Sequence, residues 1–432
     1  MSFPITTVNE RAWARQWICH VAPCTLAIVT GPLISIVYSL TRSEYAKDGS
    51  FSIAQAMRGI LCLVMFTSLF LSRRLRLLEY TIIKPLVLLA VYAILTCRLG
   101  PYPYENFVFA IKLAFAALVF VSAFYLAQSN LLNEYWLIAG AWVILLFMAI
   151  TQVIGLMRGN TVTAYASNYA TAGVTDLPSI TAILVISTLP IFLRYFPHCW
   201  WSPVGILIIF VSLFFTMLRT TLIAATVALL VISSWYLYLF RRKINLPKAV
   251  IAILVVVVFV VMGLRTQAGS DLLKRMSDLD PREGSGSGRY IFWRISLNYI
   301  LDRDISAQVL GEGMGSVREI IYQNFGLAIK SHNDWLDFAF SFGIFGLLAA
   351  LWSYLELVRF ANYLRSVKDL KFQGVFSAIV ILLLISLGMG GFYDPSFALT
   401  YAALGFWAGQ VSDYRRTTNY VECTPSYRAI QF

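Results

Sequence analysis

Long apolar runs dominate this sequence of 432 residues and constrain its fold more than any other feature. Hydrophobic residues make up 59% of the chain and charged residues only 13%, which is far from the balance of a soluble domain. A run of roughly 20 apolar residues can cross a bilayer as a helix. The sequence therefore predicts an all-α, polytopic membrane protein with about 12 transmembrane helices. The predicted helices lie at 22–40, 55–72, 80–97, 106–127, 134–157, 178–196, 199–218, 220–240, 246–264, 333–358, 373–391 and 395–412.

Basic residues flank alternate runs and predict the orientation of the chain. Lys and Arg resist translocation in short loops, so the loops that carry them stay on the cytoplasmic side. The clusters that define this side are near residues 11–15, 73–76, 241–248, 359–371 and 415–428. They share one side if both termini are cytoplasmic. The net charge of +12 then records topology, and it is not evidence for nucleic-acid binding.

One outer loop, 265–332, is long enough to carry structure of its own. It divides the chain into predicted transmembrane helices within 1–264, the loop itself, and the last helices with a short cytoplasmic tail within 333–432. Within the loop, "RYIFWRISLNYIL" and "VREIIYQNFGL" predict short amphipathic helices at the membrane surface. We therefore expect a periplasmic cap of short surface helices over the outer mouth of the bundle.

Three arginines on the outer side are candidates for binding an anion. Arg219 lies between two apolar runs in "FFTMLRTTLIAA", where a charge is costly unless it is paired or faces water. The alternative is a snorkelling arginine that marks the end of a span. Arg289 follows "SDLDPREGSGSG" and begins a predicted helix, whose N-terminus presents unpaired N–H groups and a partial positive charge. Arg294 follows on the same helix and is a secondary candidate.

His332 is one of three histidines and stands where the long loop enters an apolar run. Asn333 follows it, and Asp334 and Asp337 lie on the same predicted helix turn. Because a neutral imidazole can accept or donate a proton near neutral pH, His332 is a candidate general base. A purely structural histidine is the alternative.

Several motifs of other enzyme classes are absent from the sequence. It contains no P-loop, HExxH, GxSxG or paired His/Cys cluster, so we expect no dedicated metal site. The six cysteines have no CxxC spacing and are interpreted as packing residues. The stretch "GEGMG" at 311–315 fits either a backbone nest for phosphate or a turn between helices, and we favour the turn.

Taken together, these motifs resemble the bacterial O-antigen ligase and polymerase family. The resemblance is clearest over about 200–350, and the helix count and the single long outer loop also fit it. The residues that carry the resemblance are Arg219 in "LRTT", Arg289 in "SGR", and His332 and Asn333 followed by Gly343 and Gly346.

The resemblance implies an inverting, metal-independent glycosyltransferase of the bacterial inner membrane, with a GT-C-like architecture and a periplasmic active site. Its implied substrates are an undecaprenyl-diphosphate-linked glycan donor and a glycan acceptor, and it implies no cofactor. Membrane lipids, a chain-length regulator and a flippase are the implied partners. Arg219 and Arg289 match the family arginines thought to hold the diphosphate. His332 matches the histidine held to assist attack by the acceptor, and Arg294 and Asn333 are secondary substrate-binding candidates.

The shared motif does not distinguish a polymerase of lipid-linked repeat units from a ligase that transfers glycan to lipid A core. We favour a polymerase, because a compact cap suits two similar lipid-linked substrates. A flippase or transporter for the same lipids is the rival from another class. Lys84 and Lys112, both within predicted spans, are the residues that keep this rival open. Their alternative interpretation is a misplaced span end or a contact to lipid phosphate.

Overall fold

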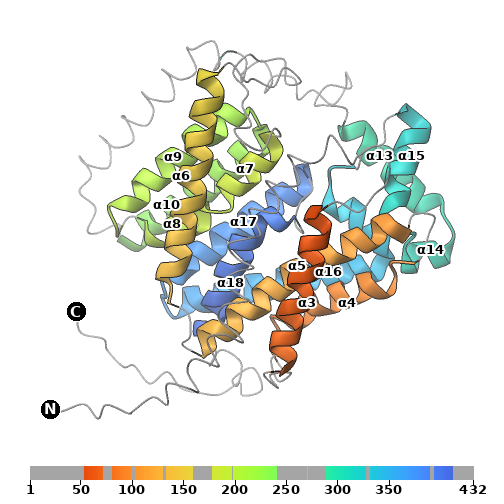
Figure 1. Cartoon of the computed structure of the whole chain (residues 1–432), viewed down its shortest axis with the longest axis horizontal. Coiled ribbons are helices and arrows are strands. Elements are labelled where there is room, and N and C mark those ends of the chain that lie inside the picture. Colours follow the sequence, from red (N-terminus) through yellow and green to blue (C-terminus); the bar gives the residue numbers. More distant parts are fainter. Residues whose placement is uncertain are drawn as a thin grey trace.

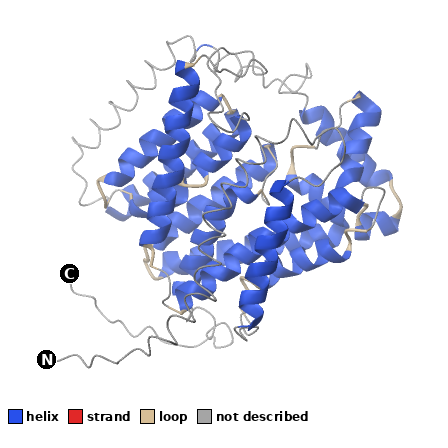
Figure 2. Ribbon diagram, in the orientation of Figure 1, coloured by secondary structure: helices blue, strands red, loops and turns tan. Residues whose placement is uncertain are grey.

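The computed structural model describes residues 53–71, 80–98, 103–129, 133–158, 178–196, 198–240, 270, 289–326, 331–389 and 394–411. Within these ranges the chain is all-helical and contains no strand (Figures 1 and 2). The same ranges contain six helical segments long and apolar enough to cross a membrane, and three shorter apolar helices. The all-α class and the multi-pass character are therefore confirmed. The count of about 12 spans is not confirmed, and the predicted runs 22–40 and 246–264 lie outside the described residues.

Each of the other predicted runs coincides with one helix or with a broken helix pair. In chain order the elements are α3 (Ile53–Leu71), α4 (Lys84–Leu95), α5 (Pro103–Gln128), α6 (Tyr135–Met157), α7 (Pro178–Ile186), α8 (Leu189–Tyr195), α9 (Trp201–Thr216), α10 (Arg219–Phe240), α13 (Arg289–Asp302), α14 (Ile305–Leu310), α15 (Met314–Phe325), α16 (Asp334–Ser366), α17 (Lys371–Gly388), the 3₁₀ helix η6 (Pro395–Phe397) and α18 (Ala398–Gln410).

The predicted span 178–196 is broken into α7 and α8. Pro190 has no N–H group to continue the helical hydrogen bonds across the break. The hydroxyls of Ser187 and Thr188 bond back to carbonyls of the preceding turn. The carbonyl oxygen of Ser187 accepts a hydrogen bond of 2.9 Å from Thr400 Oγ1, so a buried hydroxyl of α18 satisfies the broken backbone.

Small residues bring α5 and α18 into close contact near the centre of the bundle (Figure 1). Gly405 and Gly409 lie one turn apart on α18, and a Cβ atom on either would clash with a carbonyl oxygen of α5, at Phe120 or Phe124. Small residues at such spacing allow backbones to approach closely in membrane proteins, where dispersion contacts drive helix association. The pairing of α5 with α18 therefore depends on glycine at both positions.

Replacing Gly405 with Leu is expected to destabilise the bundle, because the new side chain must push α18 away from α5. Overpacking of this kind costs about 1–3 kcal/mol, and the midpoint of thermal unfolding in detergent should fall. The matched control is Gly140→Ala on α6, where a Cβ atom would lie 3.7 Å from Leu399 Cδ1, an ordinary contact. Equal midpoints for the two variants would contradict the close approach.

The outer loop contains α13, α14 and α15, which pack against α16, while α15 also contacts α5 (Figure 1). The two helices predicted in this loop are confirmed as α13 and α15, whereas α14 was not predicted. The side chains that join them to α16 form a small separate core of Phe292, Val317, Ile320, Ile321 and Phe340. The location of these helices at a membrane surface stays a prediction, as does the division of the chain at 265–332.

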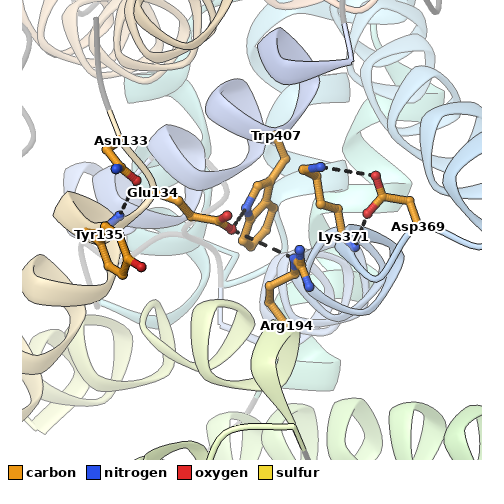
Figure 3. A network of polar contacts seen from close by, with 7 residues as sticks. All are labelled: Asn133, Glu134, Tyr135, Arg194, Asp369, Lys371 and Trp407. Atoms are coloured by element: carbon orange, nitrogen blue, oxygen red, sulfur yellow. Dashed lines mark hydrogen bonds and ion pairs between the residues drawn. The ribbon is translucent and has the colours of Figure 1, made fainter. Parts of the chain in front are cut away.

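A polar network joins helix ends at the start of α17 (Figure 3). Glu134, just before α6, accepts a hydrogen bond of 2.8 Å from Trp407 Nε1 of α18. Its carboxylate lies 3.8 Å from Arg194 Nε at the end of α8. Nearby, Lys371 pairs with Asp369 at 3.1 Å. All of these positions are ones that the charge pattern assigns to the cytoplasmic side.

Candidate functional site

Three of the predicted site residues lie at helix ends that gather around the C-terminal end of α17. Arg289 is the first residue of α13, and its Nη1 donates to the carbonyl oxygen of Gly388, the last residue of α17. The same nitrogen donates to Thr220 Oγ1 at 3.3 Å. His332 Nδ1 lies 3.3 Å from the carbonyl oxygen of Met389, which caps α17. The α17 junction, as we define it, consists of Arg219, Thr220, Arg289, His332, Gly388 and Met389.

Arg219 owes its position to a tight turn between α9 and α10. Met217 ends α9 in a left-handed conformation with φ of 55°, and α10 begins two residues later at Arg219. This agrees with the predicted turn between two spans. Arg219 is half-buried and precedes Thr220, the residue that Arg289 contacts. The two arginines, 70 positions apart in sequence, are thus linked through one threonine.

The end of α17 is a favourable place for a guanidinium group. The last carbonyl groups of a helix carry partial negative charge and have no partner within the helix. Arg289 satisfies one of them at Gly388. A Cβ atom on Gly388 would lie 2.9 Å from Thr220 Cγ2, so glycine lets α10 come this close to α17. An arginine offers five N–H donors in a planar fork, so one guanidinium can bind several acceptors at once, here the Gly388 carbonyl and the Thr220 hydroxyl.

His332 is half-buried and has an unusual backbone conformation, with φ of 59°. This left-handed region is uncommon for any residue other than glycine, and residues held there are concentrated at functional sites. Because the Met389 carbonyl can only accept, a hydrogen bond to it requires the proton on Nδ1. In the neutral imidazole, Nε2 is then the basic nitrogen. The arrangement suits a general base.

The residues on either side of His332 form the N-terminal cap of α16. Asn333 Oδ1 accepts from the backbone N–H groups of Trp335 and Leu336 at 3.0 and 3.3 Å. Ser331 Oγ donates to the buried Asp337 carboxylate at 2.6 Å, which places negative charge near the helix N-terminus. The side-chain oxygen of Asn333, a secondary substrate-binding candidate, therefore has a structural partner.

Two tryptophans hold the His332 segment between neighbouring helices. Trp293 Nε1 of α13 donates to the Ser331 carbonyl at 3.0 Å. Trp335 Nε1 donates to Ser386 Oγ of α17 at 3.1 Å. The histidine thus has a tryptophan anchor before it and another after it, so its position depends on both α13 and α17.

The helix that follows His332 is interrupted at Gly343, where φ is 60° and ψ is −159°. The break leaves carbonyl groups without helical partners. The outer loop supplies hydrogen-bond donors to these carbonyls. Arg303 donates to the carbonyl oxygens of Phe340 and Ala339 at 3.0 and 2.8 Å, and its guanidinium also stacks over the Phe340 ring. Sequence reasoning missed Arg303, because the run 333–358 is continuously apolar and gives no sign of a break.

The "GEGMG" stretch packs on the same break. The backbone N–H groups of Glu312 and Gly313 donate to the carbonyl oxygens of Phe340 and Ser341 at 3.1 and 3.0 Å. These two amides therefore bind the protein itself, which supports the turn between helices over the phosphate nest. The positive φ angles of 82° at Gly311 and 86° at Gly313 are reached at low cost only by glycine.

The other candidate cations, Arg294, Lys84 and Lys112, lie on α13, α4 and α5 and are not among the residues that make up the α17 junction. Arg294 is exposed on α13 and forms no hydrogen bond or ion pair with another described residue, so the structure does not bring it to the α17 junction. Lys84 is exposed and begins α4, which agrees with its interpretation as a span end. Lys112 lies within α5 and is half-buried.

Among the described residues, no group of three or more His, Cys, Asp or Glu is placed to hold a metal ion.

Replacing Gly343 with Ala is expected to destabilise the protein and to displace His332. The observed φ and ψ belong to a region essentially restricted to glycine, which costs other residues about 1–3 kcal/mol. A Cβ atom there would also clash with the Val309 carbonyl of α14. The thermal unfolding midpoint should fall, while Gly59→Ala, whose Cβ atom meets nothing within 4 Å, should leave it unchanged or higher. A parent-like midpoint for Gly343→Ala would argue against the break.

Replacing Asn333 with Ala should cost about 0.5–2 kcal/mol of stability through loss of the helix cap. Asn333→Asp keeps the accepting oxygen and should retain most of the stability that Asn333→Ala loses. The measurement is the thermal midpoint of each variant alongside its transfer activity. If Asn333→Ala kept the parent midpoint but lost activity, the side chain would act on substrate instead of on the helix.

Comparison with known families places a segment of the chain in a recognised family model. The family model described as O-antigen ligase matches residues 204–351. This segment includes all three residues that the sequence predicted at the catalytic site, Arg219, Arg289 and His332, and it confirms the resemblance inferred from the motifs. No curated protein matches the chain.

Proposed function

We propose that the chain polymerises polyprenyl-diphosphate-linked oligosaccharide repeat units, since residues 204–351 of this multi-pass membrane protein match the O-antigen ligase family model. The observation that carries the proposal is the gathering of Arg289, Thr220 with its neighbour Arg219, and His332 at one end of α17. Two guanidinium groups and one basic nitrogen are the groups that glycosyl transfer from a diphosphate needs. The proposed location is the bacterial inner membrane, with both termini cytoplasmic and the junction facing the periplasm.

In this proposal Arg219 and Arg289 bind the donor diphosphate. The bond that breaks joins the anomeric carbon to a phosphate oxygen, and negative charge grows on that oxygen in the transition state. Arginine forks bind such oxygens bidentately and keep their proton, so they stabilise the leaving group as the charge develops. By analogy with arginines in phosphoryl transfer, each can be worth about a thousandfold or more in rate.

His332 then acts as the general base for the acceptor. The acceptor hydroxyl oxygen forms a new bond to the anomeric carbon from the face opposite the diphosphate, which inverts the configuration. Its proton passes to Nε2, the nitrogen left basic by the contact of Nδ1 with Met389. A well-placed general base contributes about a hundredfold to ten-thousandfold. The products are the extended glycan on the acceptor lipid and a free polyprenyl diphosphate.

The second candidate function is transfer of a finished glycan to lipid A core, which the description of the matching family model favours. The chemistry at the anomeric carbon is the same for both functions. The acceptor differs, because a polymerase uses a second copy of its own lipid-linked substrate.

The experiment that tests the proposal uses purified protein in detergent with one lipid-linked repeat unit and no other acceptor. A ladder of products is the expected result. Arg219→Ala and Arg289→Ala should each reduce the rate by about a thousandfold, and His332→Ala by about a hundredfold to ten-thousandfold. A matched control is Arg365→Ala in the last turn of α16, which removes an exposed guanidinium near the opposite end of α17.

The control should keep the parent rate and the parent melting profile. Arg289→Ala also removes the donor to the Gly388 carbonyl and should lower the melting midpoint, so its rate is measured at a temperature where the variant is folded. Transfer seen only after lipid A core is added would replace the polymerase with the ligase. Full activity in His332→Ala would exclude its role as base, and full activity in both arginine variants would exclude the diphosphate site.

A further inference from the structure

Ser331 precedes His332 in the segment that enters α16, and it is fully buried, with 0% of its surface exposed. Its hydroxyl oxygen lies 2.6 Å from Asp337 Oδ1 and 3.1 Å from the backbone nitrogen of Asn333. Its carbonyl oxygen accepts a hydrogen bond of 3.0 Å from Trp293 Nε1. A buried polar residue needs such partners. Here they also fix the backbone on both sides of the histidine.

The bond between Ser331 and Asn333 closes a turn across His332. The serine hydroxyl accepts from the N–H group two residues later, which is the pattern of a serine turn with the histidine at its centre. The same hydroxyl donates its proton to Asp337 Oδ1. A bond to a carboxylate is charge-assisted and about twice as strong as a neutral one. The carboxylate therefore holds in place the hydroxyl that closes the turn.

The left-handed backbone of His332, with φ of 59°, needs support of this kind. A sparsely populated conformation persists only where the surrounding structure over-determines it. The backbone angle sets the direction in which the side chain leaves the chain, so it decides whether Nδ1 reaches the Met389 carbonyl, 3.3 Å away. That contact in turn leaves Nε2 as the basic nitrogen. The Ser331 hydroxyl thus acts on the imidazole through the backbone.

Trp293 connects the same segment to the arginine site. It follows Arg289 by four positions on α13, so the two side chains lie on one face of the helix. Arg289 contacts Gly388 and Thr220 at the α17 junction, whereas Trp293 contacts Ser331. One turn of α13 therefore carries the guanidinium and also holds the segment that contains the histidine. The separation of leaving group and base depends on this bond to the serine.

We propose that Ser331 is a positioning residue for the transfer reaction. With Trp293 and Asp337 as its partners, it holds His332 in the left-handed conformation that presents Nε2 to the acceptor hydroxyl. The inference rests on the proposed function, in which the histidine is the base. Ser331 does not touch substrate, so its whole contribution passes through the histidine. A misplacement of about 1 Å can cost about a hundredfold in rate.

The first test measures the imidazole itself and needs no transfer. Diethyl pyrocarbonate acylates neutral imidazole, and peptide mapping by mass spectrometry gives separate rates for His332 and for the exposed His198, which is the reference within the same molecule. Ser331→Ala and Trp293→Phe should each raise the ratio of the His332 rate to the His198 rate, because the ring is released from its carbonyl partner. Trp293→Phe keeps an aromatic ring without the N–H donor, so it keeps the test decisive if Ser331→Ala does not fold.

The matched control for the first test is Trp352→Phe. It removes an indole N–H that donates to Glu356 Oε1 at 3.2 Å within α16, 20 positions beyond His332. The chemical change is the same as in Trp293→Phe, and the control should keep the parent ratio. An unchanged ratio in both Ser331→Ala and Trp293→Phe, or an equal rise in the control, would overturn the proposal.

The second test measures transfer. Ser331→Ala and Trp293→Phe should each lower kcat about tenfold to a hundredfold and leave the KM of the donor unchanged, since both arginines remain. Ser331→Thr keeps the hydroxyl and should retain most of kcat. In the His332→Ala background, Ser331→Ala should cause no further loss, because residues that act as one unit have non-additive effects. The same loss in both backgrounds would mean that Ser331 acts through stability, and it would overturn the proposal.

The two tests distinguish failure of the inference from failure of the proposed function. A raised modification ratio for His332 without any glycosyl transfer would keep the effect of Ser331 on the histidine and reject the proposed function. Transfer at the parent kcat in both Ser331→Ala and Trp293→Phe would keep the proposed function and reject the positioning role.

Discussion

Backbone polar groups freed by broken helices are the constraint on which the rest of this structure depends. In an apolar bundle each carbonyl that loses its helical partner must find another within the protein. The break after Ser187 is satisfied by Thr400, the break at Gly343 by Arg303 and the amides of the outer loop, and the end of α17 by Arg289. All of these partners except Thr400 come from the outer loop, so the loop satisfies carbonyls at two of the three sites and orders the groups around His332 at the same time.

The sequence predicts the helices well, because long apolar runs have few alternative folds in a membrane. It also identifies Arg219, Arg289 and His332 as site candidates, since a charged or titratable side chain beside an apolar run needs an explanation, and their roles in a reaction stay a prediction. The partners of these residues have no such signal. Arg289 and His332 contact main-chain carbonyls of Gly388 and Met389, and a carbonyl belongs to every residue type.

Other features escape prediction for related physical reasons. The break at Gly343 interrupts a run whose hydrophobicity never falls, so only the backbone conformation identifies it. Arg303 looks like an ordinary loop cation, yet its guanidinium serves two carbonyls 36 and 37 positions away. Pro190 does indicate the break at Ser187 and Thr188 in the sequence. The average hydrophobicity of the whole run conceals this indication. Composition identifies where the chain is apolar, whereas local geometry decides where its helices stop.

The length of helix α17 sets how far the junction lies from the polar network at the other end of the helix. It has 18 residues and therefore a length of about 27 Å, close to the thickness of a bilayer's hydrocarbon core. Its first residue is held by the Lys371–Asp369 pair. The carbonyls of its last residue, Gly388, and of its capping residue, Met389, contact Arg289 and His332, respectively. Adding or removing one residue would move the far end by about 1.5 Å and rotate it by about 100°. Both carbonyls would then turn away from the arginine and the histidine together, so the number of residues in α17 matters as much as their identity.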